Sequence, residues 1–319
     1  MNKRVIITIV SSFLLFCGLF VITATKNPVI PNVPKFDQPS PPQLKAPDKY
    51  SITTPTGYLS YPNVINQLKL WNQEAPDITE IGSYGTTSKN NEIYYLRVSK
   101  NKSGSAPKVL ITACIHGNEK IANAVVMGIL GKYLTDYGRE PTITRLINER
   151  DVYWVPVVSP DSFIADSRHV DGVDPNRNFP HPGDPNMSSV APIHALRGFF
   201  LKHRFKAGLS THAYGRIYIY PYGNTNRSCP DHQTYRDICG RMATYSQYKS
   251  DQISGIQTAP PPYGFEADWF YANGAFGMVA EVGVQFRPPA SDIEPEVTRN
   301  YRSYTLFIDE APVVTLKGK

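Results

Sequence analysis

Two apolar runs of the chain each lead directly into side chains that bind metal ions. His116 and Glu119 follow the run at residues 109–115, where a helix is expected to begin, and His212 follows the run at residues 207–211. Two nitrogens and one carboxylate form a zinc ligand set that leaves the fourth position open for water, which predicts catalysis. A His-x-x-Glu pattern alone also fits a surface histidine at a capped helix start, so the second histidine carries the argument.

A carboxylate interrupts the apolar run at residues 277–282. Burying Glu281 there is costly unless the carboxylate is paired or functional. Beside a metal-activated water it would act as the general base, taking a proton as water attacks a carbonyl. The alternative is a glutamate at a strand end that reaches solvent.

Polar residues between the two histidine motifs can bind a substrate. Asn176 and Arg177 offer a fork of donors suited to a carboxylate, and Asp174 can hold the far nitrogen of a metal-bound histidine. Arg168 can face the oxygen that becomes negative during the reaction. These roles are hypotheses that depend on the fold bringing the residues together.

The surrounding pattern predicts strands and helices in alternation, and therefore an α/β fold. Apolar runs typical of strands buried on both faces occupy residues 109–115, 152–158, 207–211, 217–220 and 277–282. A hairpin at a sheet edge is expected from strands at 78–84 and 92–98. Helical spacing of apolar residues occurs near 65–71, 119–134, 192–205, 232–248 and 295–308. Ligands of such sheets bind at the carboxyl ends of strands, where the polar residues above are expected.

The first 26 residues carry a targeting signal. Lys3 and Arg4 precede an uncharged apolar run at residues 5–24, which as a helix would reach roughly 30 Å, enough to cross a bilayer. It is either a signal peptide or an N-terminal membrane anchor. Both alternatives place the rest of the chain outside the cytoplasm, in the periplasm or at the cell surface, secreted or membrane-anchored.

Residues 27–50 form a Pro-rich linker, which leaves residues 51–319 as the catalytic domain. The chain has a net charge of +6, but four of these charges belong to residues 1–50. The nearly neutral remainder predicts no nucleic-acid partner. Cys229 and Cys239 are compatible with a disulfide in an exported protein or with two free thiols, and Cys114 is expected to be a buried thiol.

This set of residues resembles the zinc metallocarboxypeptidases of the carboxypeptidase A and B type, in a bacterial-like form. The matching pieces occur in the family's order, namely His116-x-x-Glu119, Gly-Val-Asp-x-Asn-Arg-Asn over 172–178, Thr211-His212-Ala213-Tyr214, Tyr220-Pro221-Tyr222-Gly223, Asp268-Trp269 and Glu281. The Asp-x-Asn-Arg-Asn segment is the most specific of them. The resemblance covers the chain from about Tyr58 to the last helix.

The resemblance implies one zinc ion held by His116, Glu119 and His212. It also implies that Glu281 is the general base and that Asp174 supports a ligand histidine. The implied fold is a single-domain, three-layer α/β sandwich around a mixed, mostly parallel eight-stranded sheet. We expect the catalytic domain to be monomeric.

The resemblance also implies how a substrate binds. Asn176 and Arg177 would grip its terminal carboxylate, and Arg168 would polarise the scissile carbonyl. The family's specificity-pocket positions correspond to Ile219, Gly223, Ala267 and Val279, and the candidate for its lid tyrosine is Tyr263. The four pocket residues are small or apolar, which favours a neutral C-terminal side chain.

One departure leaves the substrate open. Asn118 stands where the digestive enzymes have an arginine, and the His-Gly-Asn-Glu form is similar to bacterial relatives, some of which cut peptidoglycan stem peptides. The sequence therefore predicts a carboxypeptidase acting on peptides, with the γ-D-glutamyl-diaminopimelate bond of cell-wall peptides as the alternative substrate. A zinc deacylase of N-acyl amino acids and a binding protein without turnover are further alternatives.

Overall fold

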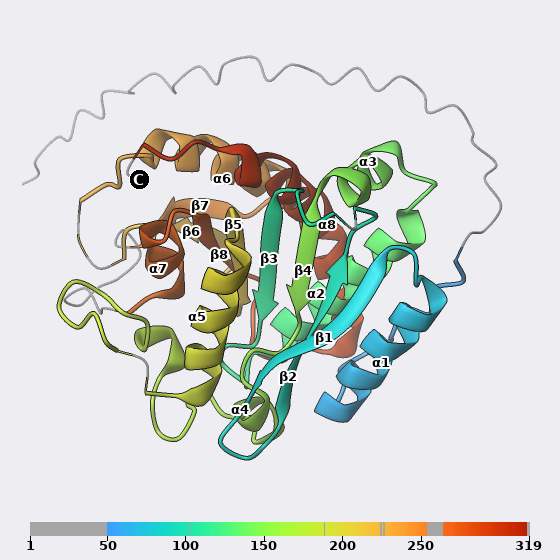
Figure 1. Cartoon of the computed structure of the whole chain (residues 1–319), viewed down its shortest axis with the longest axis horizontal. Helices are drawn as coiled ribbons and strands as arrows, with labels where there is room; N and C mark the ends of the chain where they lie inside the picture. Colours follow the sequence, from blue (N-terminus) through green and yellow to red (C-terminus); the bar gives the residue numbers. More distant parts are fainter. Residues whose placement is uncertain are drawn as a thin grey trace, which may run out of the picture. The chain divides into compact units, whose positions relative to one another are not determined.

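A mixed sheet of eight strands organises the part of the chain that the structure describes (Figure 1). The computed structural model describes residues 50–317, apart from residues 102, 188, 224, 226 and 254–263. The strand order is β1-β2-β4-β3-β5-β8-β6-β7. The strands are β1 Thr79–Thr86, β2 Glu92–Val98, β3 Lys108–Ala113, β4 Asp151–Val155, β5 Ala207–His212, β6 Ile217–Tyr220, β7 Lys249–Gln252 and β8 Phe276–Glu281.

The middle of this sheet is parallel. Strands β4, β3, β5 and β8 are parallel neighbours, and β6 with β7 forms a further parallel pair. The antiparallel pairs are β1 with β2, β2 with β4, and β6 with β8. The predicted mixed, mostly parallel sheet and its edge hairpin are confirmed. Strand β7 was not predicted, because its sequence Lys-Ser-Asp-Gln is polar and its position at the edge needs no apolar run.

Helices cover both faces of the sheet, which confirms the three-layer sandwich. Helices α1, α2, α3, α6 and α8 contribute to the core on one face, and α5 and α7 to the core on the other (Figure 1). The helices are α1 Tyr61–Glu74, α2 Lys120–Asp136, α3 Pro141–Glu149, α4 Pro160–Ile164, α5 Ala191–His203, α6 His232–Ser246, α7 Glu266–Ala272 and α8 Ile293–Glu310. The short helices α3, α4 and α7 were not predicted.

Successive side chains of a central strand point to opposite faces of the sheet and so contribute to the two cores in turn. In β4, Val152 and Trp154 face the core with α2 and α8, whereas Tyr153 and Val155 face the core with α5. This explains why the central strands are apolar throughout. Both β3 and β4 end earlier than predicted, because the apolar residues after them lie in a buried loop in which Val158 N donates to Ala113 O at 3.0 Å.

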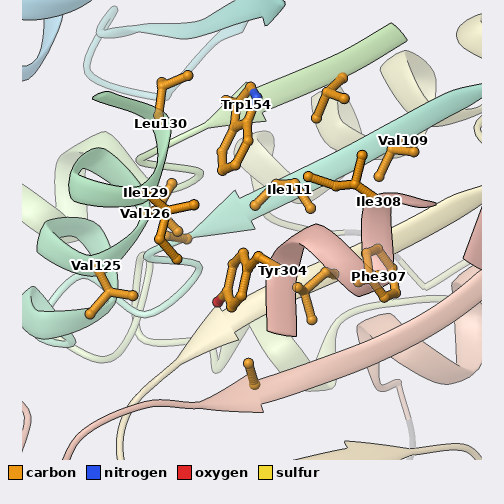
Figure 2. Packing of buried hydrophobic residues seen from close by; sticks show 14 of the residues in the cluster. Val109, Ile111, Val125, Val126, Ile129, Leu130, Trp154, Tyr304, Phe307 and Ile308 are labelled. Carbon is orange, nitrogen blue, oxygen red and sulfur yellow. The ribbon is translucent and has the colours of Figure 1, made fainter. Parts of the chain in front are cut away.

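Helix α2 is buried more completely than its predicted apolar stripe required. Residues 120–131 are all buried, because strands lie on one side of the helix and α8 on another. Figure 2 shows Val125, Val126, Ile129 and Leu130 of α2 together with strand residues and with Tyr304 of α8. The helix that carries the first ligand motif is therefore held rigidly against the sheet.

The cysteine alternative is decided in favour of thiols. Cys114, Cys229 and Cys239 are free and buried, and burial raises the pKa of the Cys229 thiol to about 11. Residues 1–26 and all but the last residue of the predicted linker lie outside the described residues. Within the described part of the chain, no helix combines the length and apolar character that a membrane crossing requires.

Candidate metal centre

The carboxyl ends of three parallel strands meet where the predicted ligands lie. Strands β3, β5 and β8 are neighbours in the sheet. His212 is paired in register with Glu281, so both side chains project to the same face of the sheet. His116 lies three residues beyond the end of β3, and Glu119 immediately precedes α2.

The donor atoms of His116, Glu119 and His212 converge on one point. Glu119 Oε1 lies 2.7 Å from Nδ1 of His116, and Oε2 lies 3.0 Å from Nδ1 of His212. One ligand atom from each residue lies within 4.8 Å of the others, and all three residues are buried. Two imidazole nitrogens and a carboxylate gathered in this way fit zinc, which prefers tetrahedral nitrogen and oxygen ligands.

Close backbone packing fixes the first ligand. A Cβ atom on Gly117 would lie 2.0 Å from the carbonyl carbon of Ser162 in α4. Only glycine lets the chain pass so close to α4 between His116 and Glu119, whose side chains turn inward. Helix α4 is in turn held by Asp161, whose Oδ1 accepts hydrogen bonds from Thr87 Oγ1 at 2.6 Å and Asn91 Nδ2 at 2.7 Å.

Asp174 joins the first ligand to an arginine. Its Oδ1 lies 2.9 Å from Nε2 of His116, on the side of the ring opposite to Glu119. Its Oδ2 accepts from Nε and Nη2 of Arg168 at 3.1 and 2.9 Å. The remaining nitrogen of Arg168, Nη1, lies 3.6 Å from Glu119 Oε1. One carboxylate thus orients a histidine and directs a guanidinium toward the ligand cluster.

The charges of the cluster shift its pKa values strongly. Burial opposes ionisation of Glu119, but the charge of His212 and hydrogen bonds from both histidines outweigh it and lower its pKa to about 2. Burial would lower the pKa of His212, but Glu119 raises it to about 10. Burial, opposed by the charge of His212 and reinforced by that of Glu119, raises the pKa of Glu281 to about 7. The cluster therefore attracts positive charge strongly.

Asn176 and Arg177 lie next to the cluster in a short 3-10 turn, Pro175–Arg177. Asp174 Oδ1 caps this turn by accepting from Asn176 N at 3.0 Å. The guanidinium carbon of Arg177 lies 4.2 Å from the centroid of the Phe265 ring. Burial lowers the pKa of Arg177, whereas Asp174 raises it. Asn176 Oδ1 accepts from Glu266 N at 2.9 Å, which leaves its amide group to donate elsewhere.

A small apolar cluster adjoins these residues. It contains three of the four predicted pocket residues, Ile219, Ala267 and Val279, together with Ile253 and Phe265. The fourth, Gly223, packs against the cluster so closely that a Cβ atom there would lie 2.6 Å from the Phe265 ring. Tyr263 lies outside the described residues.

Two further residues of this region, Phe265 and Glu266, were not predicted from the sequence. Phe265 packs on both Arg177 and the apolar cluster, yet a lone phenylalanine before an unpredicted helix carries no signal. Glu266, at the start of α7, is fully buried and lies beside His212. A carboxylate in an otherwise apolar segment was the available signal for Glu266.

The comparisons with known proteins agree with this geometry. The model of the zinc carboxypeptidase family matches residues 64–303. The chain belongs to this family. A zinc carboxypeptidase of Saccharothrix mutabilis subsp. capreolus is 23% identical, and the match covers 85% of this chain and 76% of that protein. Mouse carboxypeptidase A4 is 28% identical over 263 residues, covering 69% of this chain.

Several solved structures share the fold of this chain. Thrombin activatable fibrinolysis inhibitor superposes with a TM-score of 0.75 at 20% identity, covering 85% of this chain and 78% of that one. Carboxypeptidase A from Helicoverpa armigera gives 0.71 at 19% identity, covering 81% and 74%. The chain spans 62%, 66% and 56% of the lengths of mouse carboxypeptidases A4, A1 and A2.

Proposed function

We propose that this chain is a zinc-dependent carboxypeptidase that hydrolyses the C-terminal peptide bond of peptides. The observation that carries the proposal is the convergence of His116, Glu119 and His212 at adjoining strand ends, with Glu281 paired to His212 on the next strand. Membership of the zinc carboxypeptidase family supports it.

The substrate's terminal carboxylate would bind at the turn that carries Arg177. Arg177 is half-buried and packs on Phe265, so its guanidinium is partly desolvated and an ion pair there is strengthened. The amide of Asn176 adds a neutral donor beside it. This arrangement selects a chain end, since a peptide bond in mid-chain offers no carboxylate.

The reacting carbonyl would lie between the ligand cluster and Glu281. When bound, zinc supplies a Lewis acid for the carbonyl and lowers the pKa of water. Glu281 takes the proton of the attacking water on its carboxylate and passes it to the leaving nitrogen. Nη1 of Arg168, directed into the site by Asp174, donates to the carbonyl oxygen as it becomes negative.

The C-terminal side chain would enter the apolar cluster around Ile219, Ala267 and Val279. Glu266 does not contradict a neutral preference, although it is adjacent to Ala267 in sequence. Its Oε1 accepts from Thr112 at 3.3 Å, and its Oε2 faces His212. We therefore propose a preference for apolar C-terminal residues.

The decisive experiment measures released amino acids from peptides by the full chain, with and without a chelator. Matched peptides with a free or an amidated C-terminus serve as substrate and control. Release from the free acids alone, abolished by the chelator and restored by zinc, is expected. Equal hydrolysis of both forms would contradict the role of Arg177.

The same assay separates the remaining substrate classes. Muropeptides containing the γ-D-glutamyl-diaminopimelate bond and N-acyl amino acids form two further arms. Faster turnover of either class than of ordinary peptides would replace the proposed substrate by that class. Zinc binding without turnover in any arm would favour a binding protein.

We also propose that the catalytic domain, residues 51–319, is monomeric and acts outside the cytoplasm. The location rests on the basic residues and apolar run of the first 26 residues, followed by the Pro-rich linker. Cell fractionation with N-terminal sequencing of the mature protein tests it, because a cleaved signal removes the apolar run and an anchor retains it. Recovery in the cytoplasm would contradict the proposal.

A further inference from the structure

The two ligand histidines differ in what lies behind them. Nε2 of His116 lies 2.9 Å from Oδ1 of Asp174. Nε2 of His212 is buried and has no hydrogen-bond partner among the described residues, and the same is true of Glu266 Oε2. These two atoms lie 4.0 Å apart, about 1 Å more than a hydrogen bond.

The sheet and helix α7 bring these groups together. Ser210 and His212 alternate to the same face of β5, and Ser210 is paired with Thr112 of β3. Thr112 Oγ1 lies 3.2 Å from Ser210 Oγ and 3.3 Å from Glu266 Oε1. The donor thus orients the Glu266 carboxylate so that its second oxygen faces the imidazole.

The complete burial of the Glu266 carboxylate indicates a role beyond packing. Glu266 is 0% exposed, and an unpaired carboxylate oxygen away from water is costly. Hydrogen bonding to Thr112 alone would be served equally by a neutral glutamine. A carboxylate gains most where an imidazole N–H is directed at it, as behind a metal-binding histidine.

We propose that Glu266 is a positioning residue for the metal site, accepting the Nε2–H of His212 while Nδ1 of the same ring binds zinc. Asp174 would play the same part for His116, so each ligand histidine would be backed by its own carboxylate. This inference rests on the proposed function for the identity of the metal. Its consequence is that Glu266 strengthens zinc binding without contacting metal or substrate.

The test measures zinc affinity by competition with a chromophoric chelator. In Glu266→Gln, which keeps the size of the side chain, we expect the zinc Kd to rise about 10- to 100-fold. Asp174→Asn provides the reference effect on the other histidine. Asp231→Asn is the matched control, because Asp231 is a buried carboxylate whose oxygens accept from Tyr271 Oη and Lys317 N.

A second readout reports the hydrogen bond itself. In the zinc-loaded wild type, ¹H–¹⁵N spectra should show a His212 Nε2–H that exchanges slowly with water, and Glu266→Gln should lose this protection. Circular dichroism spectra and thermal melting of each variant, recorded after a chelator has removed the metal, verify the fold. If Glu266→Gln does not fold, Thr112→Val decides instead, since it removes the orienting donor and should weaken zinc binding severalfold.

A zinc Kd within about threefold of wild type in a folded Glu266→Gln variant would overturn the proposal. An equal weakening in Asp231→Asn would do the same, because the effect would then be general destabilisation. Neither readout uses peptide hydrolysis. If the wild type binds zinc tightly but releases no amino acid, the proposed function is wrong. The role of Glu266 is then still decided by the zinc affinity and the NMR spectra.

Discussion

Glu119 and Glu296 are both almost completely buried carboxylates, yet they belong to opposite kinds of site. Glu119 lies between two histidines, with its oxygens 2.7 and 3.0 Å from their Nδ1 atoms. Glu296, in α8, accepts from Arg216 Nε at 2.9 Å and from the hydroxyl of Tyr248. Both carboxylates are 1% exposed, so burial alone does not distinguish them.

The difference lies in what their partners can release. Hydrogen bonding to Glu296 raises the pKa of Arg216. Burial, together with the hydrogen bond to the same carboxylate, raises the pKa of Tyr248. Both groups therefore keep their protons at neutral pH. The pKa of His212 is raised as well, but a metal ion can displace the imidazole proton and bind the lone pair that this leaves at the same point. A buried carboxylate with permanent donors stabilises the fold, whereas one between two imidazoles is suited to hold a metal ion.

Removing the metal should affect the two regions most unequally. Chelation is expected to reduce peptide hydrolysis by at least about a thousandfold, because the Lewis acid contributes several kcal/mol to catalysis. The far-UV circular dichroism spectrum should stay unchanged, since the Glu296 network and both cores are independent of the metal. Stoichiometric zinc should restore the rate. Full activity after complete metal removal, verified by elemental analysis, would show that the Glu119 cluster does not act through a metal ion.

Glu281→Gln should lower kcat by about 100-fold or more while leaving zinc content unchanged, because it removes general-base catalysis but no ligand. Glu296→Gln serves as the control and should change kcat by less than about threefold. Initial rates at saturating substrate measure both. A Glu281→Gln variant within threefold of wild type would show that another group moves the proton.

Arg177→Gln should lower kcat/KM for free-acid peptides by about 30-fold, equivalent to about 2 kcal/mol for one partner of a partly buried ion pair. The Ki of a simple arylpropionate should rise by a similar factor, because it presents the same carboxylate. Arg216→Gln is the matched control, since its partner Glu296 belongs to the structural network. Equal losses in both variants would mean that Arg177 acts through stability.

The sequence predicted the parts of this molecule whose chemistry or periodicity is local. The central strands are buried on both faces and therefore stand out as apolar runs, and His116, Glu119 and His212 stand out because they follow such runs. Strand β7 was missed because an edge strand needs no apolar pattern. Short α7 was missed because seven residues show no period.

Contacts between residues on different strands and helices were harder to predict from the sequence. The position of Glu266 behind His212 depends on β3 and β5 being neighbours and on α7 returning to their ends. Nothing in the spacing of residues 212 and 266 reports this. The carboxylate of Glu266 faces His212 and Thr112, and the position of this residue next to Ala267 in the sequence does not reveal that.

Glu296→Gln should lower the free energy of unfolding by about 1–3 kcal/mol, because the buried hydroxyl of Tyr248 loses a charged acceptor and Arg216 loses its ion pair. Urea unfolding monitored by tryptophan fluorescence measures the change. Zinc affinity should stay within about threefold of wild type. A large loss of zinc binding at unchanged stability would show that the two networks are coupled.

The smallest expected effect is at Asp161, a buried carboxylate whose hydrogen-bond donors are all neutral. Burial opposes its ionisation, but hydrogen bonds from Thr87, Asn91, Lys89 N and Ser88 outweigh this and lower its pKa below the ordinary 3.8. The ionised form therefore stabilises the fold at neutral pH, and this contribution is lost as pH falls below 3.8 through the folded-state value. Asp161→Asn should cost about 1 kcal/mol at pH 7, and the difference from wild type should shrink as the pH is lowered from 5 to 3. Urea unfolding at each pH measures it. A difference that stays constant with pH would mean that the side chain's shape, and not its charge, holds α4 against the ligand loop at Gly117.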